Sequence, residues 1–112
     1  MDKDKAAILQ GTLDLLVLKT VETMGPLHGW AIAKRIEQIS QDLLEMKYGT
    51  LYPALMRLEQ GGWISSEWGT SENNRRARFY SITRQGRKQL ALEARNWQQM
   101  AAFIARVLGS TR

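Results

Sequence analysis

Three arginines lie close together in the segment EWGTSENNRRARFYSI, where Arg75 and Arg76 are adjacent and Arg78 follows. A guanidinium group binds phosphate oxygens through a planar set of N–H donors. From residue 75 to residue 88 the chain carries six basic residues and no acidic one. A solvated cluster without a partner is the alternative, but neighbouring like charges repel one another unless an anion binds them. The pattern therefore favours contact with DNA phosphates or with the minor groove.

A second group of candidate contact residues lies in the preceding segment, KYGTLYPALMRLEQGG. A short helix is predicted over 49–60, because Thr50 suits an N-cap, Pro53 suits a first turn, and two glycines follow. The side chains expected to face outward are those of Tyr48, Thr50, Tyr52, Pro53 and, one turn further on, Arg57. Their hydroxyl groups can donate to phosphates or base edges, and a helix N-terminus attracts phosphate.

Tyr52 and Pro53 have an alternative role, which is to pack this helix against its own domain. The first turn carries no Asn, Gln or Arg placed for bidentate contact with a base. The helix is therefore predicted to contact DNA, whereas the base sequence it would bind cannot be deduced. Lys34, on a neighbouring predicted helix, is a further candidate for contact with the DNA backbone.

The elements that must position these residues follow from hydrophobic periodicity and from turn-forming residues. In chain order, the predicted elements are helices over 6–24, 28–40 and 49–60, β-rich segments at 63–68 and 77–82, and a helix over 83–108. A DNA-contacting helix followed by a hairpin with a basic tip is typical of a winged helix-turn-helix. The predicted fold is mainly α with a small β-hairpin, to which an N-terminal helix and a long C-terminal helix are added.

The last predicted helix, capped by Thr83, has more apolar surface than one neighbour can cover. Apolar residues recur along it at heptad spacing, and a second stripe with Met100 and Phe103 lies beside them. The first helix is also too rich in leucine for a single exposed face, so we expect it to be covered on two sides. A homodimer is predicted, with an interface formed by Leu9, Leu13, Leu90, Ala94, Trp97, Ala101, Ile104 and Leu108. The chain then divides into a DNA-binding part (1–82), a dimerisation helix (83–108) and a tail (109–112).

Composition sets further bounds. The 112 residues suit one domain, and the net charge of +5 with a pI of about 9.9 suits a polyanionic partner. There is no cysteine, and the single histidine, His28, is expected to cap or support a turn, so no metal or cofactor is predicted. No catalytic group of residues is recognisable, which argues against an enzyme. Without a signal-type or membrane-spanning apolar run, a cytoplasmic protein is expected.

Three segments in order, LHGWAIAKRI (27–36), YGTLYPALMRLEQGGWI (48–64) and RRARFYSITRQGRKQL (75–90), resemble the PadR family of bacterial transcriptional regulators. The single C-terminal helix resembles the short subfamily, and EWGTSENNRR resembles a subgroup described from acidobacteria. The resemblance covers nearly the whole chain. It implies a winged-helix dimer in which the last helix packs on the partner's first and last helices. It also implies a repressor that binds a roughly palindromic operator in double-stranded DNA.

In some short-subfamily members a tryptophan in the last helix lines a cavity at the dimer interface and contacts flat, apolar small molecules. The resemblance makes Trp97 a candidate for binding an apolar or aromatic effector, with Met100 beside it and Asp14 facing the same cavity. Alternatives remain open: Trp97 fills a heptad position in a plain dimer core, and Asp14 lies at a solvated edge. The rival function is a winged-helix module that binds an acidic protein surface instead of DNA.

Overall fold

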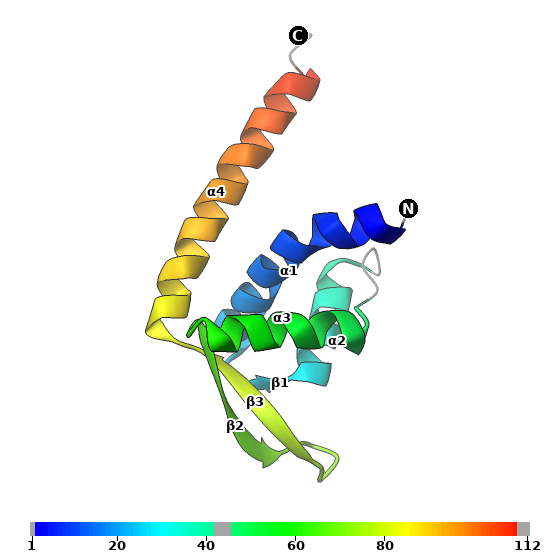
Figure 1. The fold of residues 1–112 in the computed structure, drawn as a ribbon, viewed down its shortest axis with the longest axis vertical. Coiled ribbons are helices and arrows are strands. Elements are labelled where there is room, and N and C mark those ends of the chain that lie inside the picture. The colour runs from blue at the N-terminus through cyan, green and yellow to red at the C-terminus, as the bar shows by residue number, and fades with distance from the viewer. Residues whose placement is uncertain (1, 42–45, 110–112) are drawn as a thin grey trace.

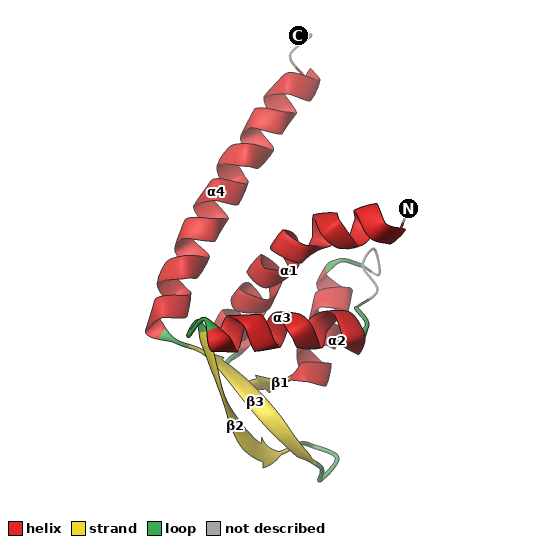
Figure 2. Ribbon diagram, in the orientation of Figure 1, coloured by secondary structure: helices red, strands yellow, loops and turns green. Residues whose placement is uncertain are grey.

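The computed structural model describes the backbone of residues 2–41 and 46–109, and the side chains in these ranges from Thr12 onward. Its elements, in chain order, are α1 (Asp2–Met24), β1 (Leu27–His28), α2 (Gly29–Ile39), α3 (Tyr48–Gln60), β2 (Ile64–Thr70), β3 (Arg76–Ile82) and α4 (Arg84–Gly109). Three helices form the body, the β2–β3 hairpin projects from one end, and α4 extends away from the body (Figures 1 and 2). This arrangement confirms the predicted winged helix-turn-helix with added terminal helices.

Helix α1 lies at the centre of the core. It contacts α2, α3, β3 and α4. Its buried residues are Leu13, Val17, Leu18, Val21 and Thr20. The two-sided coverage expected for this helix is thus supplied largely by elements of the same chain. The helix begins at Asp2, earlier than the predicted start at residue 6. The intervening residues, DKDK, contain no glycine or proline to prevent helix formation.

Burial corrects part of the predicted dimer interface. Leu13 is 3% exposed and Leu90 is 4% exposed, because both pack in the core of their own protomer. Neither has surface left to contact a partner. The side chain of Leu9 lies outside the described residues.

Helix α3 starts at Tyr48, with Lys47 as its N-cap. The Lys47 carbonyl accepts from the amides of Thr50 and Leu51 at 2.9 and 3.0 Å. Thr50 is therefore in the first turn, and its predicted role as N-cap is wrong. Pro53 lies inside the helix, beyond the first turn where it was predicted. Its ring removes the amide that would otherwise donate to the Gly49 carbonyl.

The end of α3 sets where the hairpin begins. Gly62 adopts a φ of 82°, and the amides of Gly62 and Trp63 donate to the carbonyls of Glu59 and Leu58. This pair of hydrogen bonds is a Schellman motif, which requires a left-handed residue at the position of Gly62. The predicted helix-ending role of the two glycines is confirmed.

The sheet has the strand order β1-β3-β2, and both pairings are antiparallel. The two-residue strand β1 was not predicted, because it is too short to show alternation. The pairs Ser66–Tyr80, Trp68–Arg78 and Thr70–Arg76 lie opposite one another on one face of the hairpin. Tyr80 is buried and Ile82 half-buried on this same face, as predicted. The arginines at 76 and 78 therefore point to the side on which Tyr80 meets the core.

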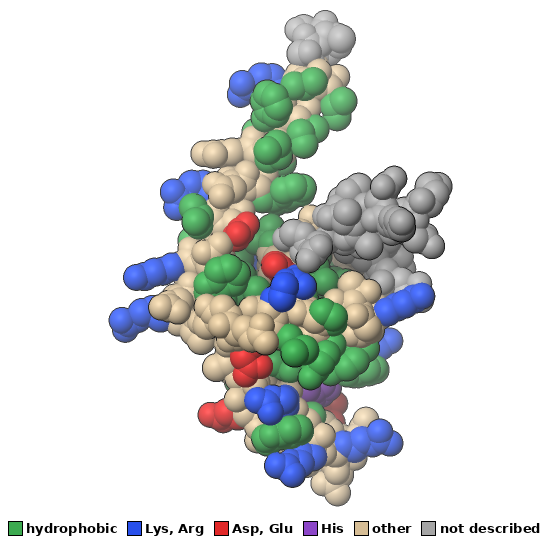
Figure 3. Space-filling model, viewed as in Figure 1, with side chains coloured by type: hydrophobic (Ala, Val, Ile, Leu, Met, Phe, Trp, Pro, Cys, Tyr) green, Lys and Arg blue, Asp and Glu red, His purple; other side chains and the backbone are tan. Residues whose placement is uncertain are grey.

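Helix α4 begins with the predicted cap. Thr83 Oγ1 accepts from the Gly86 amide at 3.0 Å and donates to the Gly62 carbonyl at 2.7 Å. Beyond Ala94 the helix leaves the body, and a band of hydrophobic side chains follows its outer half (Figure 3). None of the helices in the described part of the chain is both long and apolar enough to cross a membrane.

Candidate nucleic-acid interface

A cleft of about 510 Å³ opens between the N-terminal end of α3, the start of α2 and the hairpin. Its lining is mainly aromatic and basic: His28, Gly29, Trp30, Tyr48, Tyr52, Trp68, Arg76, Ala77, Arg78 and Tyr80. Tyr48 and Tyr52 lie one turn apart on α3, with ring centroids 5.5 Å apart, and both are exposed. Thr50 and Pro53 are also exposed on α3. The structure thus brings Tyr48 and Tyr52 to the cleft beside the hairpin, whereas Thr50 and Pro53 do not line it.

His28 links two of the elements that border this cleft. As predicted, it caps α2: its Nδ1 accepts from the Ala31 amide at 3.3 Å. Its ring also meets Phe79 of β3 edge-on, with 5.4 Å between centroids. One side chain therefore joins the start of α2 to the central strand of the sheet.

Arg75 and Arg76 are the exposed arginines of the hairpin. Arg75 lies in the turn, where Ser71 bonds across the tip through its amide and hydroxyl and Asn74 adopts a φ of 61°. Arg76 lies over the Trp68 ring, with Cζ 4.6 Å from the centroid. No carboxylate among the described residues pairs with either arginine. Basic side chains surround a hydrophobic one at this end of the molecule (Figure 3).

Arg78 has a different environment from its neighbours. Its Nε and Nη2 donate to Ser66 Oγ at 3.0 and 2.7 Å, and Ser66 donates to Glu59 Oε2 at 2.6 Å. Arg78 Nη2 also lies 3.7 Å from that carboxylate. Arg78 therefore joins β3 to α3, and its predicted contact with DNA stays a prediction.

Arg57 is likewise engaged within the chain. Its Nη2 binds Asp14 Oδ1 of α1 at 2.7 Å. Because successive helical residues are about 100° apart, Arg57 and Glu59 lie on nearly opposite sides of α3. Arg57 thus faces α1, away from the hairpin side, and its predicted contact with the DNA backbone stays a prediction. Asp14, a predicted effector contact, already has this cation as its partner.

The Asp14 carboxyl has a raised pKa, because burial disfavours its charge by more than Arg57 stabilises it, and Glu93 adds to the rise. A carboxyl whose folded pKa exceeds its unfolded value binds its proton more readily in the folded state. Ionisation of Asp14 therefore opposes folding, with no effect below the unfolded pKa and a full effect above the folded one.

We expect the free energy of unfolding of Asp14→Asn to increase relative to that of the wild type as pH rises from about 3.5 to 6. Urea unfolding of both proteins at these two pH values measures this difference. A wild-type protein that gains stability over Asp14→Asn across the same interval would contradict the assignment, because the Arg57 pair would then outweigh burial.

Lys34 is exposed on α2, as the predicted DNA contact requires. Its Nζ lies 5.4 Å from the ring centroid of Trp30, one turn earlier. Trp30 is 66% exposed and Trp68 is 55% exposed. Neither tryptophan was predicted as a site residue. The spacing of Trp30 and Lys34 on a helix was a usable signal, because such side chains are neighbours.

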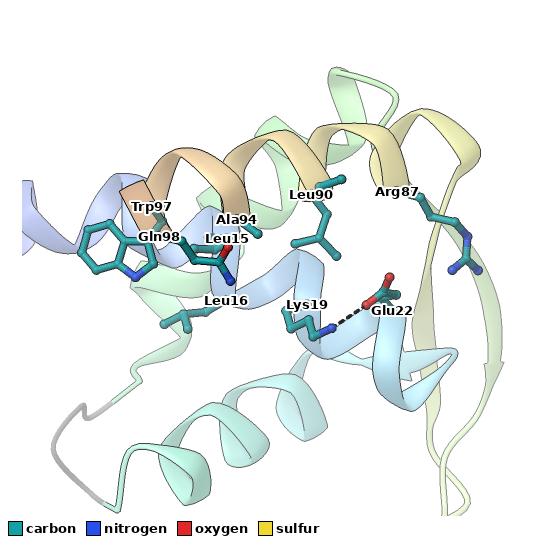
Figure 4. A pocket seen from close by; sticks show the side chains of 10 residues that line it. Leu15, Leu16, Lys19, Glu22, Arg87, Leu90, Ala94, Trp97 and Gln98 are labelled. Carbon is teal, nitrogen blue, oxygen red and sulfur yellow. Dashed lines mark hydrogen bonds and ion pairs between the residues drawn. The ribbon is translucent and has the colours of Figure 1, made fainter. Parts of the chain in front are cut away.

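A second groove, of about 470 Å³, lies between α1 and α4 (Figure 4). Trp97, Ala94 and Leu16 line one end, and the ion pair of Lys19 with Glu22 lies toward the other. Met100 lies in a separate shallow hollow with Phe103. Of the three predicted effector residues, only Trp97 lines this groove, with Met100 one turn further along α4, and Asp14 is not part of its lining.

Residues 17–92 match the transcriptional regulator PadR-like family, a span that includes the cleft and both of its basic edges. The chain belongs to this family. The family resemblance predicted from the sequence is thus confirmed. PadR-like proteins are transcriptional regulators, and the chain is accordingly a DNA-binding regulator and not an enzyme.

Solved structures agree with this assignment. A transcriptional regulator from Clostridium thermocellum is 30% identical, with a TM-score of 0.80 over 89% of this chain and 96% of that chain. A PadR family regulator from Eggerthella lenta is 25% identical, with a TM-score of 0.79 over 96% and 91% of the two chains. One from Clostridium difficile is 26% identical, with a TM-score of 0.73 over 86% and 97%. The similarity extends over the long C-terminal helix as well as the winged-helix part.

Proposed function

We propose that this PadR-like regulator is a cytoplasmic, homodimeric repressor that binds a palindromic operator in double-stranded DNA. The observation that supports this most is the open surface formed by the first turns of α3 and the two exposed arginines of the hairpin. In this proposal α3 enters the major groove, with Tyr48, Thr50, Tyr52 and Pro53 at the DNA. Arg75 and Arg76 bind phosphates or the minor groove beside it, and Lys34 binds the backbone on the α2 side.

The dimer is proposed from the unpartnered side of α4. Trp97, Met100, Phe103 and Ile104 are between 43% and 58% exposed, although they are large and apolar. Leu108 is 77% exposed. A contiguous apolar surface of this kind marks an interface. A second copy of α4 with the same heptad stripe covers it by twofold symmetry, with the smaller Ala94 and Ala101 allowing close approach. Two α3 helices then read half-sites about 34 Å apart.

The double variant Arg75→Ala/Arg76→Ala is expected to weaken operator binding about 10²- to 10⁴-fold, because each of the two protomers loses two phosphate contacts. The slope of log K against log salt should also become shallower by roughly 3.6, or about 0.9 for each of the four phosphates that the dimer no longer contacts. Mobility shifts on DNA upstream of the protein's own gene, across a salt series and with unrelated competitor, measure both quantities.

Arg84→Ala/Arg87→Ala is the matched control, since it removes the same charge from the exposed first turns of α4. It should change the slope far less than the hairpin variant does. If wild-type protein binds no DNA specifically at any salt concentration, the proposal of an operator-binding repressor fails. Binding of an acidic protein surface would then be the function to test.

For regulation, we propose that an apolar or aromatic small molecule binds beside Trp97 in the dimer and releases the operator. The groove at Trp97 supports this, because its lining includes Leu15, Leu16, Leu90 and Ala94 and it borders the proposed interface. Fluorescence titration of the wild type against Trp97→Phe with flat apolar compounds tests the idea. A quenching signal that persists unchanged in Trp97→Phe would place the compound elsewhere.

A further inference from the structure

Two exposed tryptophans flank the N-terminal end of α3, and each lies against a basic side chain. On the α2 side, Lys34 Nζ is 5.4 Å from the Trp30 ring centroid. On the hairpin side, Arg76 Cζ is 4.6 Å from the Trp68 centroid. Both rings line the cleft in which Tyr48 and Tyr52 lie. The cleft is therefore bordered on two sides by the same combination of an indole and a cation.

Neither ring belongs to the hydrophobic core. Both are more than half exposed, so they contribute little to the core, and exposure of a large apolar ring to water is unfavourable. An indole face does attract a cation, by about twofold to fivefold in population at an exposed site. It also restricts a long side chain that would otherwise sample many rotamers. A cation ordered in this way loses less entropy when it binds a phosphate.

We propose that Trp30 and Trp68 are positioning residues for DNA binding, which hold Lys34 and Arg76 ready for phosphates on the two sides of α3. The inference rests on the proposed DNA-binding surface and assigns roles within it. The tryptophans act through their cations and not through contact with DNA. Lys34 and Arg76 are the groups that neutralise phosphate.

Arg78 differs from Arg76, because its position does not depend on the Trp68 ring alone. It also lies near the Trp68 ring, with Cζ 5.1 Å from the centroid, but Ser66 and Glu59 hold it as well. Loss of Trp68 therefore leaves Arg78 attached to α3. Arg76 has no other partner among the described residues, so its orientation depends on the ring.

Double-mutant cycles on DNA affinity test the proposal. Trp68→Ala should weaken operator binding about twofold to fivefold per protomer, or about fourfold to 25-fold for the dimer, in the wild-type background and have no effect in an Arg76→Ala background. Trp30→Ala should behave in the same way with Lys34→Ala. Trp68→Phe should restore most of the affinity, since a phenyl ring also attracts a cation.

The slope of log K against log salt distinguishes the cations that bind phosphate from residues that only position them. Arg76→Ala and Lys34→Ala should each make it shallower by about 1.8, the loss of one phosphate contact in each protomer. Arg78→Ala should weaken binding with a smaller change in slope, because Glu59 already offsets its charge.

Additive effects of Trp68→Ala and Arg76→Ala would overturn the proposal, because the ring would then contact DNA itself. So would an Arg78→Ala variant with the full slope change of a phosphate contact. Both results require a wild type that binds DNA with a steep salt dependence. If that binding is absent, the proposed function fails and not only this assignment. Unfolding curves of each variant exclude misfolding as the cause of lost binding.

Discussion

Ile104→Glu is expected to convert the proposed dimer into monomers and to weaken operator binding by at least about a hundredfold. Ile104 lies on the apolar side of α4 and is 43% exposed in the single chain, so its surface is available to a partner. Two symmetry-related carboxylates at a heptad position would be buried close together without a counter-ion, which is strongly unfavourable. A monomer retains only one half-site and loses the avidity of the linked pair, typically 10²- to 10⁴-fold.

Analytical ultracentrifugation gives the oligomeric state, and a mobility shift gives the affinity. Ala102→Glu is the matched control, because it adds the same charge to the same helix about 200° away from Ile104. It should remain dimeric and bind nearly as well as the wild type. If Ile104→Glu is still a dimer, the interface does not use this side of α4.

Gly86→Ala is expected to destabilise the fold by about 3 kcal/mol, at the upper end of the usual cost of overpacking. A Cβ at residue 86 would lie 2.0 Å from the Trp63 carbonyl oxygen and 2.8 Å from Ile82 Cγ1. The carbonyl is a backbone atom that accepts from the Thr83 amide at 3.1 Å, so it cannot move aside as a side chain would. The helix α4 must shift instead, together with the cap that Thr83 forms.

Urea unfolding measures this loss, and Gly109→Ala in the same helix is its control. Nothing lies within 4 Å of a Cβ built at residue 109, so that variant should be as stable as the wild type. The shift has a second consequence, because Thr83 also bonds to Gly62 at the end of α3. Where Gly86→Ala still folds, we expect weaker operator binding, since in the proposed dimer the angle between α4 and α3 would set the spacing of the half-sites. Wild-type stability of Gly86→Ala would contradict the close approach of α4 to Trp63.

The sequence by itself predicted the order and type of the elements, apart from β1, and much of the proposed DNA-binding surface. Regular patterns carried this information: the apolar spacing of α3, the glycines that end it, and the alternation that places Tyr80 toward the core. Local hydrogen bonds were predicted where one side chain and one nearby amide suffice, as for the caps formed by His28 and Thr83. Such interactions depend on residues a few positions apart, so the sequence contains them almost completely.

Only the tertiary structure decided which charged residues are available. Asp14 and Arg57 are 43 positions apart, and neither the pair nor the raised pKa of Asp14 follows from local sequence. Glu59, Ser66 and Arg78 meet because the hairpin folds back against α3.

The same holds for burial and for the exposed aromatic rings. Leu13 and Leu90 occupy heptad-like positions, yet the crossing of α1 and α4 places both in the core. Trp68 comes next to Arg76 through the register of the hairpin, which a one-residue slip would reverse. Periodicity shows that a helix or strand has an apolar side. It does not show which neighbour covers that side, because the packing of distant elements determines it.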